Sequence, residues 1–173
     1  MEQLGLLATD GRSLDAPVHP PERPPMLKRP IQAPTVLNEA YDYGLPSSFS
    51  RAMSIDLGTH TIMFISGTAS VDEQGATIHV GDFRAQLWRT LRNISELLKA
   101  DGMTWHDIVR TTCYIRDIER DYADFNEVRT TFYSWLGLDP LPASTGIQAR
   151  ICRSDLLVEI EAIAVCPSND KPL

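Results

Sequence analysis

The sequence has too few cysteines, and the wrong spacing between them, for a disulfide framework. Cys113, Cys152 and Cys166 are an odd number and form no CxxC pair, which favours free thiols in a reducing compartment. Long apolar runs are also missing: no segment has the length of a membrane-spanning helix, and the N-terminus has no apolar signal core. We therefore expect a cytoplasmic location and no membrane partner.

Positive charge is scarce as well. The chain has 16 Lys and Arg against 23 Asp and Glu, a net charge of −7, whereas nucleic acid demands a basic footprint. The four histidines show no HxH or HExxH spacing, and neither GxGxxG nor GxxxxGK[ST] occurs. We expect no nucleic-acid partner, no bound metal and no cofactor.

Proline is concentrated near the N-terminus. Seven of the 12 prolines lie between Pro17 and Pro34, and proline fixes φ and removes a backbone donor, so neither a helix nor a central strand is expected there. We expect residues 1–35 to be an extension, either a disordered arm or a segment that wraps over a neighbouring subunit and covers its cleft. Residues 36–173 are expected to form one domain.

The remaining chain alternates between strand and helix patterns. Strands are expected at 49–55 and 61–66, joined by a turn at Gly58, then at 108–117 and in two segments after residue 142. A short strand at 77–80 is a further option. The first helix, capped by Asp82, ends near residue 100 and has an apolar stripe of Phe83, Leu87, Leu91, Ile94 and Leu98. A second helix at about 122–136 places Phe125, Val128, Phe132 and Trp135 on one face. This order predicts an α+β fold, one sheet covered on one face by two helices.

The last strand carries two glutamates within an apolar run. Leu156, Val158, Ile160, Ala162 and Ala164 share the face expected under the helices, and Glu159 and Glu161 lie on the other face between Leu157, Ile163 and Val165. A face that is apolar at its ends and acidic in its centre is compatible with a polar pocket covered by another subunit, and also with plain ion pairing.

Several motifs in order resemble the Rid (YjgF-type) family, whose founding activity is the deamination of reactive imine intermediates. They are "FSRAM", "FISGTASVD", "TLRNISELLKADG", "DIVRTTCYIRD", "DFNEV", "PAST" and "LLVEIEAIAV", and they span 46–165. The resemblance implies a chorismate-mutase-like α+β domain and a homotrimer. It also implies that the sheets of the trimer enclose a barrel and that small molecules bind in clefts between subunits.

The resemblance also implies roles for individual residues. Glu159 matches the glutamate that positions or activates the attacking water, and burial would raise its pKa into a range useful for proton transfer. Glu161 is expected to be structural, balancing Arg110 or Arg116. Ser66 and Asn126 match pocket residues, Phe49 replaces a ring that is often tyrosine, and Gly146, whose backbone would position the substrate, stands where a cysteine is common. Ser144 and Thr145 bond either the backbone of a turn or a polar group of the ligand.

One motif departs from the family pattern. The family usually has "PAR[ST]", whose arginine binds the carboxylate of the substrate imine, but Ser144 stands at that position here. A serine cannot bind a carboxylate by charge, whereas a guanidinium suits that role. Arg51, Arg150 and Arg153 are candidates to replace the arginine from shifted positions, or are surface or ion-paired arginines. Cys152 is either a reactive thiol beside a basic residue or an inert one.

Three functions remain open from the sequence. The first is a hydrolase, deaminase or lyase-type enzyme acting on a small imine, carbonyl or enol ether with Glu159 as acid/base. The second is a non-catalytic module that binds a metabolite. The third is a chorismatase-like enzyme of secondary metabolism, because "ARICRSDLLVEIEA" is similar to the closing segment of chorismatases.

Overall fold

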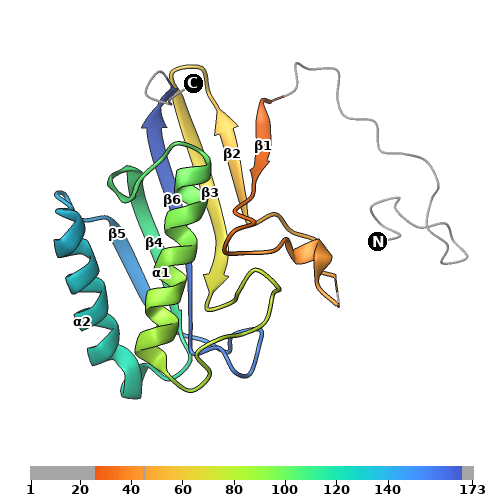
Figure 1. Cartoon of the computed structure of the whole chain (residues 1–173). Helices are drawn as coiled ribbons and strands as arrows, with labels where there is room; N and C mark the ends of the chain where they lie inside the picture. Colours follow the sequence, from red (N-terminus) through yellow and green to blue (C-terminus); the bar gives the residue numbers. More distant parts are fainter. Residues whose placement is uncertain (1–25, 45, 169–173) are drawn as a thin grey trace, which may run out of the picture.

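The computed structural model describes residues 26–44 and 46–168. Six strands form one mixed sheet in the order β1-β2-β3-β6-β4-β5 (Figure 1). The strands are β1 (Lys28–Ile31), β2 (Ala52–Asp56), β3 (His60–Ala69), β4 (Ile108–Ile115), β5 (Ala143–Gln148) and β6 (Val158–Pro167). Only the β4–β5 pair is parallel among the described pairs.

Two helices, α1 (Phe83–Ala100) and α2 (Ile118–Leu136), cover one face of this sheet (Figure 1). Two short 3-10 helices, η2 (Ala40–Asp42) and η3 (Trp105–Asp107), lie in the connections. The α+β prediction, with one mixed sheet covered on one face by two helices, is confirmed. Among the described helices none is long and apolar enough to cross a membrane.

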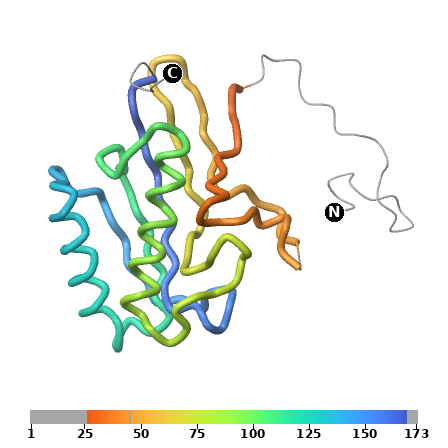
Figure 2. The backbone as a smooth tube through the Cα atoms, viewed as in Figure 1, coloured from red at the N-terminus to blue at the C-terminus, as the bar shows by residue number. Residues whose placement is uncertain are grey.

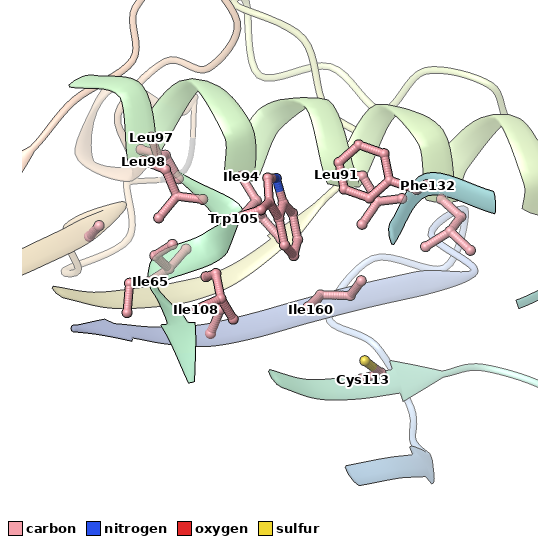
Figure 3. Close-up of a cluster of buried hydrophobic side chains, with 14 of the residues drawn as sticks. Ile65, Leu91, Ile94, Leu97, Leu98, Trp105, Ile108, Cys113, Phe132 and Ile160 are labelled. Carbon is pink, nitrogen blue, oxygen red and sulfur yellow. The ribbon is translucent and has the colours of Figure 1, made fainter. Parts of the chain in front are cut away.

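The first helix has the predicted bounds. The Asp82 side chain accepts a hydrogen bond from the backbone N–H of Ala85 and caps the helix, and its apolar stripe is buried. Figure 3 shows Leu91 and Ile94 facing the sheet above Ile160 of β6. The predicted inner face of β6 is also buried, so the period of two along this strand is confirmed.

The second helix starts earlier than predicted, at Ile118 and not at Tyr122. Asp117 caps it by accepting a hydrogen bond from the backbone N–H of Arg120, and this first turn is too charged to show apolar periodicity. Trp135 shares a face with Phe132, and their rings stack at 6.3 Å. Trp135 is nevertheless 78% exposed.

The strands differ from the prediction at their ends. The first hairpin strand begins at Ala52 and not at residue 49, and β3 continues to Ala69 across an irregularity between Ile65 and Thr68. The optional strand at 77–80 is only an isolated bridge between Val71 and Thr77. The turn at Gly58 is present, with a φ of 87° that suits glycine.

The sheet includes part of the segment assigned to the N-terminal extension. Strand β1 pairs with β2 only, with Pro30 opposite Met53 at the sheet edge, where a missing N–H is tolerated. Ile31 and Ala33 are buried in the core. The prediction that residues 1–35 form an extension falls outside the described residues for its first 25 residues. Segments 36–44, 46–49, 67–75 and 152–156 meet at one end of the sheet (Figure 2).

Candidate functional site

Glu159 lies on the sheet face that the helices leave uncovered. Strand β6 places it between Ala69 of β3 and Tyr114 of β4, half-buried. The Glu159 carboxylate rests against Gly67, where a Cβ atom would overlap with Glu159 Oε1. A glycine at residue 67 is therefore required for this position of the carboxylate.

The surroundings of Glu159 favour its protonated form. Burial, and then the negative charge of Glu161, raise the pKa of the Glu159 carboxyl. Among residues 26–44 and 46–168, no group donates a hydrogen bond to this carboxylate. A carboxyl group with a raised pKa and no internal donor is available to exchange protons with a ligand or water.

Glu159 opens into a cavity of about 520 Å³. Four of the predicted site residues line it together: Phe49, Arg51, Cys152 and Glu159. Tyr43 and Arg153 also line it. Arg150, by contrast, is exposed and is not among the lining residues. Of the three arginines considered as replacements, the structure thus brings Arg51 and Arg153 to the cavity that holds Glu159.

Arg51 is fixed in the wall of this cavity. Only 3% of it is exposed, and its Nε donates a hydrogen bond to the carbonyl oxygen of Asn38 at 2.8 Å. A terminal nitrogen of the same guanidinium donates to the Tyr43 hydroxyl. Its Cζ also lies 5.6 Å from the centre of the Phe49 ring.

Ser66 and Glu161 line a separate cavity of about 280 Å³ on the same sheet face, together with Arg110. Ser66 Oγ donates to the carbonyl oxygen of Ser50 at 2.8 Å. Arg110 donates to Thr145 Oγ1 at 3.1 Å. Within the described ranges Glu161 forms no ion pair. The expected balance between Glu161 and Arg110 or Arg116 is therefore wrong.

Glu161 lacks these ion pairs because Arg110 and Arg116 donate their hydrogen bonds to other groups. The guanidinium of Arg116 donates to backbone carbonyl groups of the loop before β6, including that of Ile151 at 3.4 Å. Burial, then the charge of Glu161 and a side-chain hydrogen bond with it, raise the pKa of Tyr114, which lies on β4 opposite Glu159. Glu161 therefore acts on Tyr114 through charge and a hydrogen bond, and on Glu159 through its charge.

The "PAST" segment lies away from Glu159 within this chain. Ser144, Thr145 and Gly146 belong to β5, an edge strand whose residues are all exposed. Ser144 Oγ accepts hydrogen bonds from Thr111 Oγ1 at 3.0 Å and from a terminal nitrogen of Arg129 at 3.2 Å. Ser144 and Arg129 line a cavity of about 480 Å³ that does not include Glu159.

Arg129 was not among the site residues predicted from the sequence. Its second terminal nitrogen donates to Asn126 Oδ1 at 2.7 Å, and its Cζ lies 4.6 Å from the centre of the Phe125 ring. Arg129 thus links the predicted residues Asn126 and Ser144. The three-residue spacing from Asn126 to Arg129 places both on one face of α2, and this was the available signal.

The cysteines and the side chains that could bind a metal are the remaining candidates for reactive groups. In the part of the chain that the structure describes, all three cysteines are free, and only Cys152 is exposed. Burial raises the pKa of the Cys113 thiol. The protonated thiol, which is less reactive than the thiolate, is therefore favoured. No cluster of three His, Cys, Asp or Glu side chains suited to a metal occurs among the described residues.

Known proteins resemble this chain in sequence and in fold. A family model described as Endoribonuclease L-PSP matches residues 46–166. The chain is 32% identical over 102 residues to a RutC family protein of Pyrococcus horikoshii, covering 59% of this chain and 77% of that protein. It is 30% identical over 117 residues to the 2-iminobutanoate/2-iminopropanoate deaminase of Mus musculus, covering 68% and 80%.

Two solved structures from E. coli share the fold. The YjgF gene product aligns with a TM-score of 0.63 and 27% identity over 79% of this chain and 98% of that one. TdcF with bound serine aligns with a TM-score of 0.65 and 27% identity over 80% and 98%. The chain therefore belongs to the Endoribonuclease L-PSP family, the Rid (YjgF-type) family that its motifs resemble.

Proposed function

We propose that this protein hydrolyses a small imine to a carbonyl compound and ammonia, with Glu159 as the acid/base. The observation that carries the proposal is the Glu159 carboxyl itself, half-buried in a cavity, without a described hydrogen-bond donor and with a raised pKa. The deaminase name of the mouse relative supports the same reaction class.

The reaction balances with water as the only co-substrate. Starting from the protonated imine, the Glu159 carboxylate removes a proton from water as the water oxygen attacks the imine carbon, which gives a neutral carbinolamine. The protonated Glu159 then gives this proton to nitrogen, and the C–N bond breaks. As the carbonyl forms, the carbinolamine hydroxyl passes its proton to the Glu159 carboxylate, which passes it to the departing ammonia. A raised pKa brings the carboxyl closer to neutral pH than an ordinary glutamate, which suits both halves of this transfer.

We further propose that the working form is a homotrimer with one site at each subunit interface. Edge strand β5 is exposed along its whole length, and Phe64 and Ile147 are 44% and 42% exposed on the sheet. Unpaired edges and exposed apolar groups favour covering by another chain. Such packing would bring the Ser144–Arg129 cavity of one subunit towards the Glu159 cavity of the next.

Nucleic acid is not part of the proposal, although the family description names an endoribonuclease. A net charge of −7 opposes binding to a phosphate backbone. Absence of cleavage of a single-stranded RNA in the presence of active protein is the expected result.

The experiment is an imine-decay assay. An amino-acid oxidase or a dehydratase generates 2-aminoacrylate and a series of longer 2-imino acids, and semicarbazide trapping follows their decay. We expect the protein to accelerate decay of at least one imine above the spontaneous rate. Binding of the corresponding 2-oxo acids without acceleration of any imine would favour the metabolite-binding alternative. Turnover of chorismate and not of imines would favour the chorismatase-like alternative.

A further inference from the structure

Two guanidinium groups share one aromatic ring in the Glu159 cavity. The Cζ atoms of Arg51 and Arg153 lie 5.2 Å and 4.9 Å from the centre of the Tyr43 ring. All three residues line the cavity that holds Glu159. The cavity therefore combines one carboxyl of raised pKa with two cations held by a ring.

Arg153 has no anionic partner in the described part of the chain. One of its terminal nitrogens donates to the carbonyl oxygen of Gly75 at 2.7 Å and to Thr77 Oγ1 at 3.3 Å. Both acceptors are neutral, and no hydrogen bond uses its other two nitrogens within residues 26–44 and 46–168. A half-buried guanidinium with spare donors can bind an anion through charge-assisted hydrogen bonds.

Arg51 is the second cation, and it has a more rigid setting. Its hydrogen bonds to Asn38 and Tyr43 fix the side chain. The buried Glu39 lies close enough to interact electrostatically with its guanidinium. Burial raises the pKa of the Glu39 carboxyl and Arg51 partly offsets this rise. Glu39 therefore balances part of the Arg51 charge, which leaves Arg153 as the less compensated of the two.

Part of the cavity wall is apolar. Val71, Leu156 and Phe49 line the same cavity, whose volume is about 520 Å³. This volume lies within the range of sites for small organic ligands. A ligand that fits this lining has an anionic group for the arginines, an apolar part for the wall and a reactive carbon near Glu159.

We propose that Arg153, assisted by Arg51, takes the role of the family arginine that Ser144 replaces and binds the carboxylate of the imine in this cavity. Tyr43 is the positioning residue that holds both guanidinium groups. It lies upstream of the family-matched residues 46–166, so the recognition element is supplied by the N-terminal segment of this chain. The inference rests on the proposed function only for the reaction at Glu159.

The test is direct binding of stable product acids, which needs no turnover. The probes are 2-oxobutanoate and 2-oxo-4-phenylbutanoate, each with its neutral amide, titrated by calorimetry. We expect wild type to bind each acid more tightly than its amide, and Arg153→Met to weaken acid binding by about tenfold to a hundredfold, as for loss of a charge-assisted hydrogen bond. Arg150→Met is the matched control, because Arg150 is exposed and outside the cavity.

Tyr43→Ala provides the second variant. It removes the ring beneath both guanidinium groups, so we expect it to weaken acid binding while the amides are unaffected. Tyr43→Phe keeps the ring and removes only the hydroxyl that accepts from Arg51, so we expect a smaller effect than with alanine.

Three results would overturn the inference: unchanged acid affinity in Arg153→Met, equal affinity of acids and amides for wild type, or no acid binding to wild type at millimolar concentration. These outcomes are separate from a failure of the proposed function. Arg153-dependent acid binding without imine turnover would sink the proposed function alone. Imine turnover that depends on Glu159 but is unchanged in Arg153→Met would contradict the inference and leave the proposed function intact.

Discussion

The carboxylate of Glu159 lies directly against the Cα of Gly67, across neighbouring strands β6 and β3. A Cβ atom at residue 67 would occupy the place of Glu159 Oε1. The irregular pairing between Ile65 and Thr68 places the glycine there. Gly67 thus makes room for the carboxylate that the proposed reaction needs.

Gly67→Ala should therefore impair the reaction more than the fold. We expect kcat/KM for imine decay to fall by about a hundredfold, because an ångström-scale displacement of a catalytic group costs that much. The thermal unfolding midpoint, measured in parallel, should change little, since the Glu159 side chain can move into the open cavity. An alanine variant with wild-type kcat/KM would show that this position of Glu159 is not required.

The raised pKa of Glu159 predicts a pH dependence of stability. The native state holds this proton more tightly than the unfolded chain, so the free energy of unfolding falls as pH rises from the ordinary carboxyl range through the raised pKa. Glu159→Gln has no such proton to lose. Urea unfolding at several pH values should show that the free energy of unfolding of the variant increases relative to that of wild type as pH rises. The difference between the two free energies should be smallest at acidic pH. A difference that is the same at all pH values would contradict the raised pKa.

Ser144→Arg tests where the substrate carboxylate binds. Arg129 already donates to Ser144 Oγ, so a new arginine would place a second cation beside it. We expect a lower unfolding midpoint and no gain in kcat/KM on 2-aminoacrylate. A tenfold or larger gain would show that the carboxylate binds at residue 144 and not at Arg153.

Strand β1 predicts a structural contribution from the proline-rich segment. Ile31 is 3% exposed in the core, whereas Leu27 is 69% exposed. Ile31→Ala should lower the free energy of unfolding by about 2–4 kcal/mol, as for other buried isoleucines, and Leu27→Ala should have almost no effect. Equal effects of the two substitutions in chemical denaturation would show that β1 adds little to the fold.

The sequence was sufficient where a periodic pattern governs the structure. The stripe from Phe83 to Leu98 and the alternation around Glu159 and Glu161 were both confirmed, because local spacing decides which side chains face the core. The start of α2 was missed because its first turn is charged and carries no apolar period. The strand at Lys28–Ile31 was hidden by its proline, which the sheet edge tolerates.

The candidate site could be predicted less completely. Phe49 and Glu159 were found by motif and Arg51 as a candidate cation near Phe49, and the structure places all three around one cavity. The choice between Arg150 and Arg153 depends on the path of an irregular loop, which no spacing rule determines. Tyr43 and Arg129 act through contacts between segments distant in the chain, so their partners appear only once the fold is known.

The most direct test of the account compares Glu159→Gln with Glu161→Gln on the fastest imine substrate. Both variants remove a carboxylate from the same face of β6, but only Glu159 lines the large cavity. We predict that Glu159→Gln lowers kcat by about a hundredfold or more, as for loss of a general acid/base. Glu161→Gln should lose less than about tenfold, because Glu161 lies outside this cavity and acts on Glu159 through its charge. Full activity of Glu159→Gln would contradict the central claim.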